Sequence, residues 1–76
     1  MPYVQVKVIE GVFGPEEKKE MVRAVTDAMV GVEGESMRGV TWVTIEEVAS
    51  GSWGIGGTAL TTADITAMRT ATPAPV

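Results

Sequence analysis

The chain is short, acidic and lacks two residue types that supply much of enzyme chemistry. It has 76 residues and a formal net charge of −4, and it contains neither cysteine nor histidine. Disulfides, thiol nucleophiles, histidine bases and the common zinc sites are therefore excluded. The acidic balance also argues against a nucleic-acid partner, which would be bound by clustered Lys and Arg side chains.

Length and hydropathy also limit where the protein acts. No stretch approaches the ~20 apolar residues of a membrane span, and the N-terminus lacks the charged and apolar regions of a signal peptide. We therefore expect a cytoplasmic protein without membrane contact, built as a single domain over residues 1–76. Because so small a chain buries little surface and has no disulfide to compensate, we also expect an oligomer.

The first expected element is a strand over residues 2–9. Val4, Val6 and Val8 fall on one face, and this period of two with β-branched residues is typical of a strand. Gly11 ends the strand, and Gly14 closes the loop that follows.

The second expected element is an amphipathic helix of about 16 residues that begins at Pro15. Proline suits the first helical position, and Glu16 and Glu17 favour the helix dipole. Gly31 and Gly34 are the expected stop signals. The apolar residues that recur at steps of three and four are Met21, Val22, Val25, Ala28, Met29 and Val32.

A second strand is expected over residues 40–48, with Val43 and Ile45 on one face and Trp42 and Thr44 on the other. The order strand, helix, strand predicts an α+β fold with a β-α-β unit, parallel strands and a right-handed crossover. One helix covers only one face of a two-stranded sheet. We therefore expect the other face to meet another copy of the chain.

The rest of the chain is rich in glycine and then weakly helical. The segment 51–57 predicts a hairpin or a bulge, and residues 62–69 predict a helix that Asp64 helps to start. The tail 71–76 is expected to be loosely ordered. Glu46 and Glu47 are adjacent on a strand, so their side chains point to opposite faces and cannot form a catalytic carboxylate pair.

Pro2 is the first candidate for chemistry. Removal of Met1 would leave a free proline amine, and an α-amino group has a pKa of about 7.7–8.0, close to neutral pH. Such an amine is suited to abstract a proton next to a carbonyl group. Alternatively, Pro2 only begins an edge strand, where its missing N–H costs nothing.

Two further residue types are candidates for substrate binding. Trp53 lies among glycines, and we expect its ring to pack against a partner subunit or a pocket wall. Of the three arginines, Arg38 lies in the loop before the second strand, whereas Arg23 is expected on the helix surface and Arg69 near the tail.

Together these features resemble the 4-oxalocrotonate tautomerase family of the tautomerase superfamily. The resemblance covers residues 2 to 57 and defines the expected core, with residues 58–76 as a C-terminal extension. It depends on Pro2 after Met1, the strand end VIEG at 8–11, the helix start EEK at 16–18, the strand VTIEEV at 43–48 and the segment WGIGG at 53–57.

The resemblance implies a β-α-β monomer, with a C-terminal hairpin loop, that pairs into dimers and assembles as a hexamer. It implies that Pro2, after loss of Met1, is the general base that moves a proton between atoms of a small enol or keto acid, without cofactor or metal. Trp53 stands where an aromatic residue helps to form the pocket. Dehalogenases and hydratases among the relatives use the same proline to add water.

Two departures from the family pattern affect the expected substrate. The resemblance implies arginines at positions 12 and 42, where this chain has Val12 and Trp42. Val and Trp cannot bind a carboxylate as the bidentate guanidinium does, so we do not expect efficient turnover of the diacid 2-hydroxymuconate. Trp42 is then a candidate substrate-binding residue, and Arg38 or Lys7 of another subunit is expected to replace the missing charge.

Three interpretations remain open from the sequence. The first is a homo-oligomeric tautomerase, dimeric or hexameric, that acts on a less charged acid. The second is one subunit of a hetero-hexamer, in which a related chain supplies the arginines. The third is a non-catalytic oligomeric module that keeps the fold without the site.

Overall fold

The computed structural model describes residues 2–71 and divides the chain into two compact units. The first unit comprises residues 1–7 and 13–46, and the second comprises residues 8–12 and 47–76. Helices and strands are interspersed along the chain in an α+β arrangement, as expected. The predicted loosely ordered tail lies mostly outside the described residues, since only its first residue, Ala71, is described, as the end of a helix.

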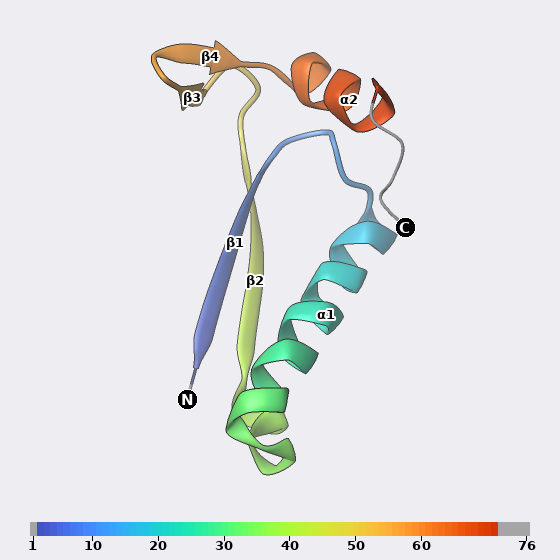
Figure 1. The fold of residues 1–76 in the computed structure, drawn as a ribbon, viewed down its shortest axis with the longest axis vertical. Helices are drawn as coiled ribbons and strands as arrows, with labels where there is room; N and C mark the ends of the chain where they lie inside the picture. Colours follow the sequence, from blue (N-terminus) through green and yellow to red (C-terminus); the bar gives the residue numbers. More distant parts are fainter. Residues whose placement is uncertain (1, 72–76) are drawn as a thin grey trace. The chain divides into compact units, whose positions relative to one another are not determined.

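Strands β1 (Tyr3–Ile9) and β2 (Trp42–Val48) form a two-stranded parallel sheet (Figure 1). In the first unit, the Trp42 amide donates to the Pro2 carbonyl over 3.0 Å, and in the second the Glu10 amide donates to the Val48 carbonyl over 2.8 Å. Exposure alternates along β1 and most of β2, which confirms the predicted period of two.

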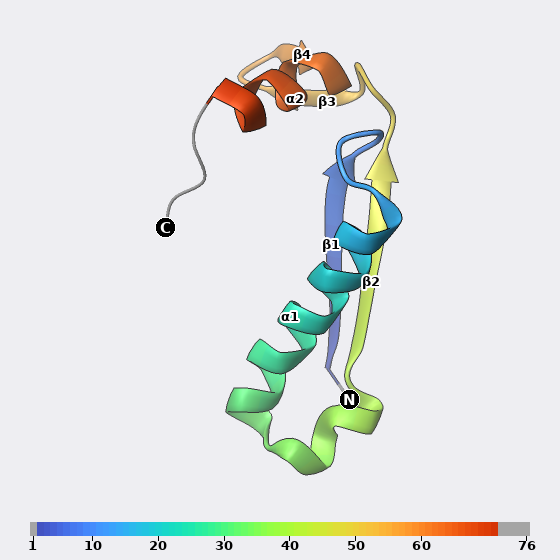
Figure 2. The same cartoon turned by 90° about the vertical axis from the view of Figure 1, so that its right-hand side faces the viewer.

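Helix α1 (Pro15–Glu33) lies over one face of the sheet (Figure 2). It begins where the sequence predicts, because Pro15 cannot donate a hydrogen bond and the Glu17 carboxylate accepts the Gly14 amide over 3.2 Å. It ends at Gly34, which has φ of +104° and whose amide donates to the Val30 carbonyl over 2.8 Å.

The predicted length and buried face of α1 are partly wrong. The helix has 19 residues and passes through Gly31, because one glycine inside a helix costs only about 1 kcal/mol relative to alanine. Val32 is 88% exposed, whereas Val30, absent from the predicted apolar stripe, is only 8% exposed. The next element lies against α1.

That next element is a 3₁₀-helix, η1 (Glu35–Val40), which the sequence analysis placed in a loop and in the start of the second strand. The Arg38 guanidinium pairs with the Glu35 carboxylate over 3.1 Å, one turn apart. Because η1 continues to Val40, β2 begins at Trp42.

The second unit contains a hairpin and a helix. Strands β3 (Trp53–Ile55) and β4 (Thr58–Leu60) pair antiparallel with Trp53 opposite Leu60, which confirms the hairpin alternative. Gly56 and Gly57 form the two-residue turn with φ of +58° and +85°, the conformation that a tight hairpin favours.

Helix α2 (Thr62–Ala71) follows the hairpin, as predicted. The Thr61 hydroxyl accepts the Asp64 amide over 3.2 Å, and the Asp64 carboxylate accepts the Thr61 amide over 2.9 Å. This reciprocal pair satisfies two backbone amides at the start of the helix, so Asp64 has the predicted role.

The described part of the chain has a very small core. Among residues 2–70, only Ile9 in the second unit and Val30 in the first are buried. No helix in the described part of the chain is long and apolar enough to cross a bilayer.

The hairpin turn gives a test of the fold. Replacing Gly57 by alanine forces a side chain into a left-handed backbone, so Gly57→Ala is expected to lower the free energy of unfolding by about 1–2 kcal/mol. Urea denaturation followed by circular dichroism measures the change. Gly31→Ala is the control: Gly31 lies on an exposed helix surface, and an added methyl group would meet no other atom within 4 Å, so the substitution is expected to stabilise. Equal stability of the two variants would contradict the left-handed conformation assigned to Gly57 in the hairpin turn.

Candidate functional site

Pro2 lies immediately before β1 and is half-buried. Its carbonyl accepts the Trp42 amide over 3.0 Å, so the sheet holds the peptide group that carries the pyrrolidine ring. Two of the predicted site residues, Pro2 and Trp42, are therefore brought together by the start of the parallel sheet.

Trp42 and Tyr3 lie next to each other on the face of the sheet that α1 leaves uncovered. In a parallel sheet, a residue whose amide donates to the carbonyl of residue 2 is paired with residue 3. Trp42 is therefore the cross-strand neighbour of Tyr3, and the two strands lie about 4.8 Å apart. The Tyr3 and Trp42 side chains are 57% and 60% exposed. The Tyr3 hydroxyl is hydrogen-bonded to the Thr44 hydroxyl over 2.9 Å, which confirms that both strands present these residues on one face.

Further along the same face, the side chains are polar and already paired. The Gln5 amide donates to the Glu46 carboxylate over 2.6 Å, and the Lys7 ammonium lies 3.9 Å from the same carboxylate. Lys7, one of the two predicted replacements for the missing arginines, thus has an acidic partner. The face is aromatic at the Pro2 end and charged at the other.

Arg38, the other predicted replacement, is engaged by two carboxylates of the first unit. Its guanidinium lies 2.8 Å from Asp27 on α1 and 3.1 Å from Glu35 on η1. Asp27 also pairs with Arg23 over 2.9 Å. The hydrogen bond from Arg38 holds the pKa of Asp27 below its ordinary value of 3.8, and that same bond raises the pKa of Arg38. A substrate would have to compete with these partners for Arg38.

Trp53 belongs to the second unit, where it is half-buried opposite Leu60. Ile55, two residues on and on the same side of the hairpin, is 61% exposed. The hairpin therefore presents an apolar surface that includes the predicted pocket residue.

A polar cluster of the second unit attaches α2 to the turn after β1. The Thr62 hydroxyl donates to the Glu10 carbonyl over 2.5 Å, and the Ser50 amide donates to the Glu10 carboxylate over 3.0 Å. The Thr62 amide donates to the Ser50 hydroxyl over 2.9 Å. A Cβ on Gly11 would lie 3.1 Å from the Thr62 methyl group, so the glycine permits this close approach.

Arg69 makes a long-range contact that its sequence pattern does not predict. Its guanidinium donates to the carbonyl of Val12 over 3.1 Å, across 57 positions of sequence. An arginine side chain thus reaches position 12, one of the two positions where the family resemblance implies this residue. Nothing in the local pattern around Arg69 indicates such a contact, because it depends on how α2 docks.

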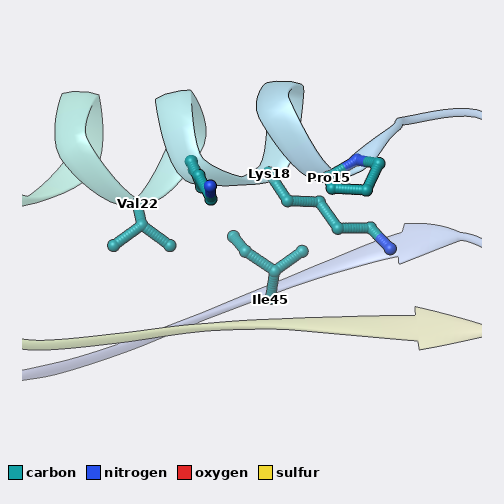
Figure 3. Close-up of a pocket in the computed structure, with 5 residues that line it drawn as sticks. Pro15, Lys18, Val22 and Ile45 are labelled. Carbon is teal, nitrogen blue, oxygen red and sulfur yellow. The ribbon is translucent and has the colours of Figure 1, made fainter.

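The first unit also has a cavity of about 450 Å³ between α1 and β2, lined by Pro15, Lys18, Lys19, Val22 and Ile45. Figure 3 shows the Val22 and Ile45 side chains directed toward each other between the helix and the strand. Neither Pro2 nor Trp42 lines this cavity, so it is separate from the candidate site. Among residues 2–71, no group of three or more acidic side chains is arranged to hold a metal ion.

Comparisons with known proteins show which family the chain belongs to. A family model described as "Tautomerase enzyme" matches residues 2–63, and the match begins at Pro2. The chain belongs to the tautomerase family. Family membership supports a tautomerase-like, isomerase-type function and confirms the predicted resemblance.

Individual relatives cover most of the chain. "Probable tautomerase K2" of Dickeya dadantii (strain 3937) is 34% identical over 61 residues, which are 80% of this chain and 90% of that protein. A structure from a study of 4-oxalocrotonate tautomerase isozymes of Methylibium petroleiphilum is 31% identical, covers 84% of this chain and 97% of its own, and has a TM-score of 0.69. DmpI of Helicobacter pylori is 30% identical, with coverage of 78% and 95% and a TM-score of 0.69.

The ion pairs of this tautomerase give a second test. Since the hydrogen bond from Arg38 is the largest cause of the lowered Asp27 pKa, Arg38→Gln is expected to raise that pKa more than Arg23→Gln does. Carboxyl chemical shifts followed by NMR as a function of pH measure both changes. Because the folded-state pKa is depressed, the pair stabilises the fold above the ordinary value of 3.8, and this contribution is lost as pH falls through the folded-state pKa. An equal rise of the Asp27 pKa in the two variants would contradict the assignment of Arg38 as the main partner of Asp27.

Proposed function

We propose that the protein is a homo-oligomeric tautomerase in which Pro2, freed by removal of Met1, is the general base. The observation that carries the proposal is the match to the tautomerase family from Pro2 onward, in a fold that begins β1 directly after this residue. The substrate is a small enol or α-keto acid, and the reaction is a keto–enol or related proton transfer.

The chemistry follows from the amine. A free α-amino group has a pKa of about 7.7–8.0, so roughly 10–15% of the amine is unprotonated at pH 7 and available as a base. The amine removes a proton from the carbon next to the carbonyl, the electron pair moves onto the carbonyl oxygen, and this oxygen takes up a proton. No redox step occurs, so the chain's own groups are sufficient for the proton transfer.

Arg69 is proposed to bind the substrate carboxylate. Its guanidinium lies at the Val12 carbonyl, the position where the resemblance implies a carboxylate-binding arginine. A guanidinium forms two parallel hydrogen bonds with a carboxylate, which both binds and orients the acid. Arg38 and Lys7 contact protein carboxylates with which a substrate would have to compete, and the assignment to Arg69 depends on its position beside Val12.

The oligomer is proposed on energetic grounds. With only Ile9 and Val30 buried among residues 2–70, a single copy has little apolar burial to offset the entropy of folding. Association buries further apolar surface, such as that of Ile55 on the hairpin. The active site is then proposed to draw residues from more than one copy.

Replacing the proline tests the proposed base. Pro2→Ala replaces the secondary amine with a primary one of different basicity and geometry, so kcat/KM for ketonisation of an enol acid is expected to fall by about 10²–10⁴-fold. Ultraviolet absorbance follows the reaction, and intact mass must show loss of Met1 in both proteins. A retained Met1 in the active protein, or an unchanged rate in the variant, would refute the proposal.

Replacing the arginine tests the proposed carboxylate contact. Arg69→Gln removes a charge-assisted contact of about 1.5–3 kcal/mol, so kcat/KM is expected to fall by roughly 10- to 100-fold. Arg69→Lys keeps the charge and is expected to recover part of the loss. Arg23→Gln, which removes one charge from an exposed helix surface, is the control and is expected to stay near the wild-type rate. Similar rates for all three variants would exclude Arg69 from the site.

A further inference from the structure

We propose that Thr62 is a positioning residue, which fixes the start of α2 to the turn after β1 and thereby places the Arg69 guanidinium at residue 12. The inference rests on the proposed function, because it requires that Arg69 binds the substrate carboxylate. It goes beyond that function by giving α2 a role in the reaction. The matched family model ends at residue 63, so most of this helix lies outside the match.

The first argument is a closed ring of hydrogen bonds at the start of α2. The Thr62 hydroxyl donates to the Glu10 carbonyl over 2.5 Å, and the Thr62 amide donates to the Ser50 hydroxyl over 2.9 Å. The Ser50 amide in turn donates to the Glu10 carboxylate over 3.0 Å. Amides in the first turn of a helix have no partner within the helix, so Ser50 satisfies one of them. Thr62 thus joins α2 to two other segments of the second unit.

The second argument is that the acceptor of the Thr62 hydroxyl is itself held in place. The Glu10 amide donates to the Val48 carbonyl over 2.8 Å, so Glu10 is bonded through its amide, its carbonyl and its carboxylate. The next residue, Gly11, has φ of +79°, and a Cβ there would lie 3.1 Å from the Thr62 methyl group. A glycine at this position therefore lets α2 approach a fixed point of the turn.

The third argument is the spacing of Thr62 and Arg69 along α2. Seven residues make about two helical turns, so the two side chains lie on one face of the helix, about 10.5 Å apart along its axis. The carbonyls of residues 10 and 12 accept their bonds, and the α-carbons of these two residues are at most about 7 Å apart. Helix side chains lean toward the N-terminus, so the long Arg69 side chain reaches back over the difference. The two contacts are therefore compatible with each other.

The fourth argument is the small apolar contact of α2. Among residues 62–70, Thr62 and Ile65 are half-buried and the other residues are exposed. Ile65 lies three residues from Thr62 and four from Arg69, on the same face. A helix of only 10 residues is marginal in water without tertiary contacts. The hydrogen bonds of Thr62 therefore contribute much of what keeps Arg69 at residue 12.

The consequence for the reaction is a preorganised carboxylate contact. The acceptor of Arg69 is the backbone carbonyl of Val12, so this bond orients the guanidinium without cancelling its charge. A guanidinium held in one position loses less conformational entropy when a carboxylate binds than a mobile one does. The substrate and the transition state both make this contact, so its loss is expected mainly in KM. A substrate without a carboxylate is expected to be unaffected.

Kinetics with an acid and its uncharged analogue test the positioning role. The probes are 2-hydroxypenta-2,4-dienoate and its methyl ester. Thr62→Val removes the hydroxyl and is expected to raise KM for the acid by about 3- to 10-fold, with kcat and the rate on the ester changed less than about twofold. Thr62→Ser keeps the hydroxyl and is expected to recover most of the wild-type KM. Thr66→Val, the same substitution at an exposed position of α2, is the matched control.

Two further measurements separate positioning from a general loss of structure. In the Arg69→Gln background, Thr62→Val is expected to change KM less than about twofold, because the side chain that it positions is already removed. Hydrogen exchange followed by mass spectrometry reports on the attachment of α2 directly. In Thr62→Val, exchange is expected to be at least about threefold faster in α2 and unchanged in α1.

The outcomes distinguish this inference from the proposed function. An unchanged KM in Thr62→Val, an equal effect on acid and ester, or a full effect in the Arg69→Gln background would overturn the positioning role and leave the base at Pro2 standing. Unchanged rates in Pro2→Ala would instead refute the proposed base, and the comparison of acid with ester would still decide the role of Thr62.

Discussion

The parallel pairing of β1 with β2 is the constraint on which the other elements depend. Two parallel strands cannot be joined by a tight turn, so the chain needs a crossover, which α1 and η1 provide. The pairing also sorts the side chains: Ile45 points toward α1 (Figure 3), whereas Tyr3 and Trp42 lie on the open face. The same ladder holds Pro2 at the start of the sheet.

The parts of the fold that are encoded locally could be predicted from the sequence. Alternation defines both strands, the residues around Pro15 define the start of α1, and adjacent glycines at 56 and 57 define a hairpin turn. Thr61 and Asp64 form the cap that starts α2. Each of these signals operates within a few residues, where the backbone's own preferences decide the conformation.

The features that could not be predicted depend on packing between distant segments. Val30 is buried and Val32 exposed, although both are valines on one helix, and η1 lies against that helix. In the candidate site, the sequence identified Pro2 and Trp42 but not the contact of Arg69 with residue 12, which spans 57 positions. Periodicity carries no information about such a contact, because it is set by the docking of α2 rather than by α2 itself.

The attachment of Pro2 has a consequence for how the proposed base is oriented. The pyrrolidine ring fixes φ, and the hydrogen bond to Trp42 fixes the plane of the following peptide group. Rotation about the Cα–C bond of Pro2 is then the main torsion that remains to orient the nitrogen lone pair. A lysine base would have to immobilise its long side chain before each proton transfer, at an entropic cost of about 1.5–2 kcal/mol. For the proposed base at Pro2, most of that ordering would be completed during folding, so the backbone would limit the directions from which a proton can be taken.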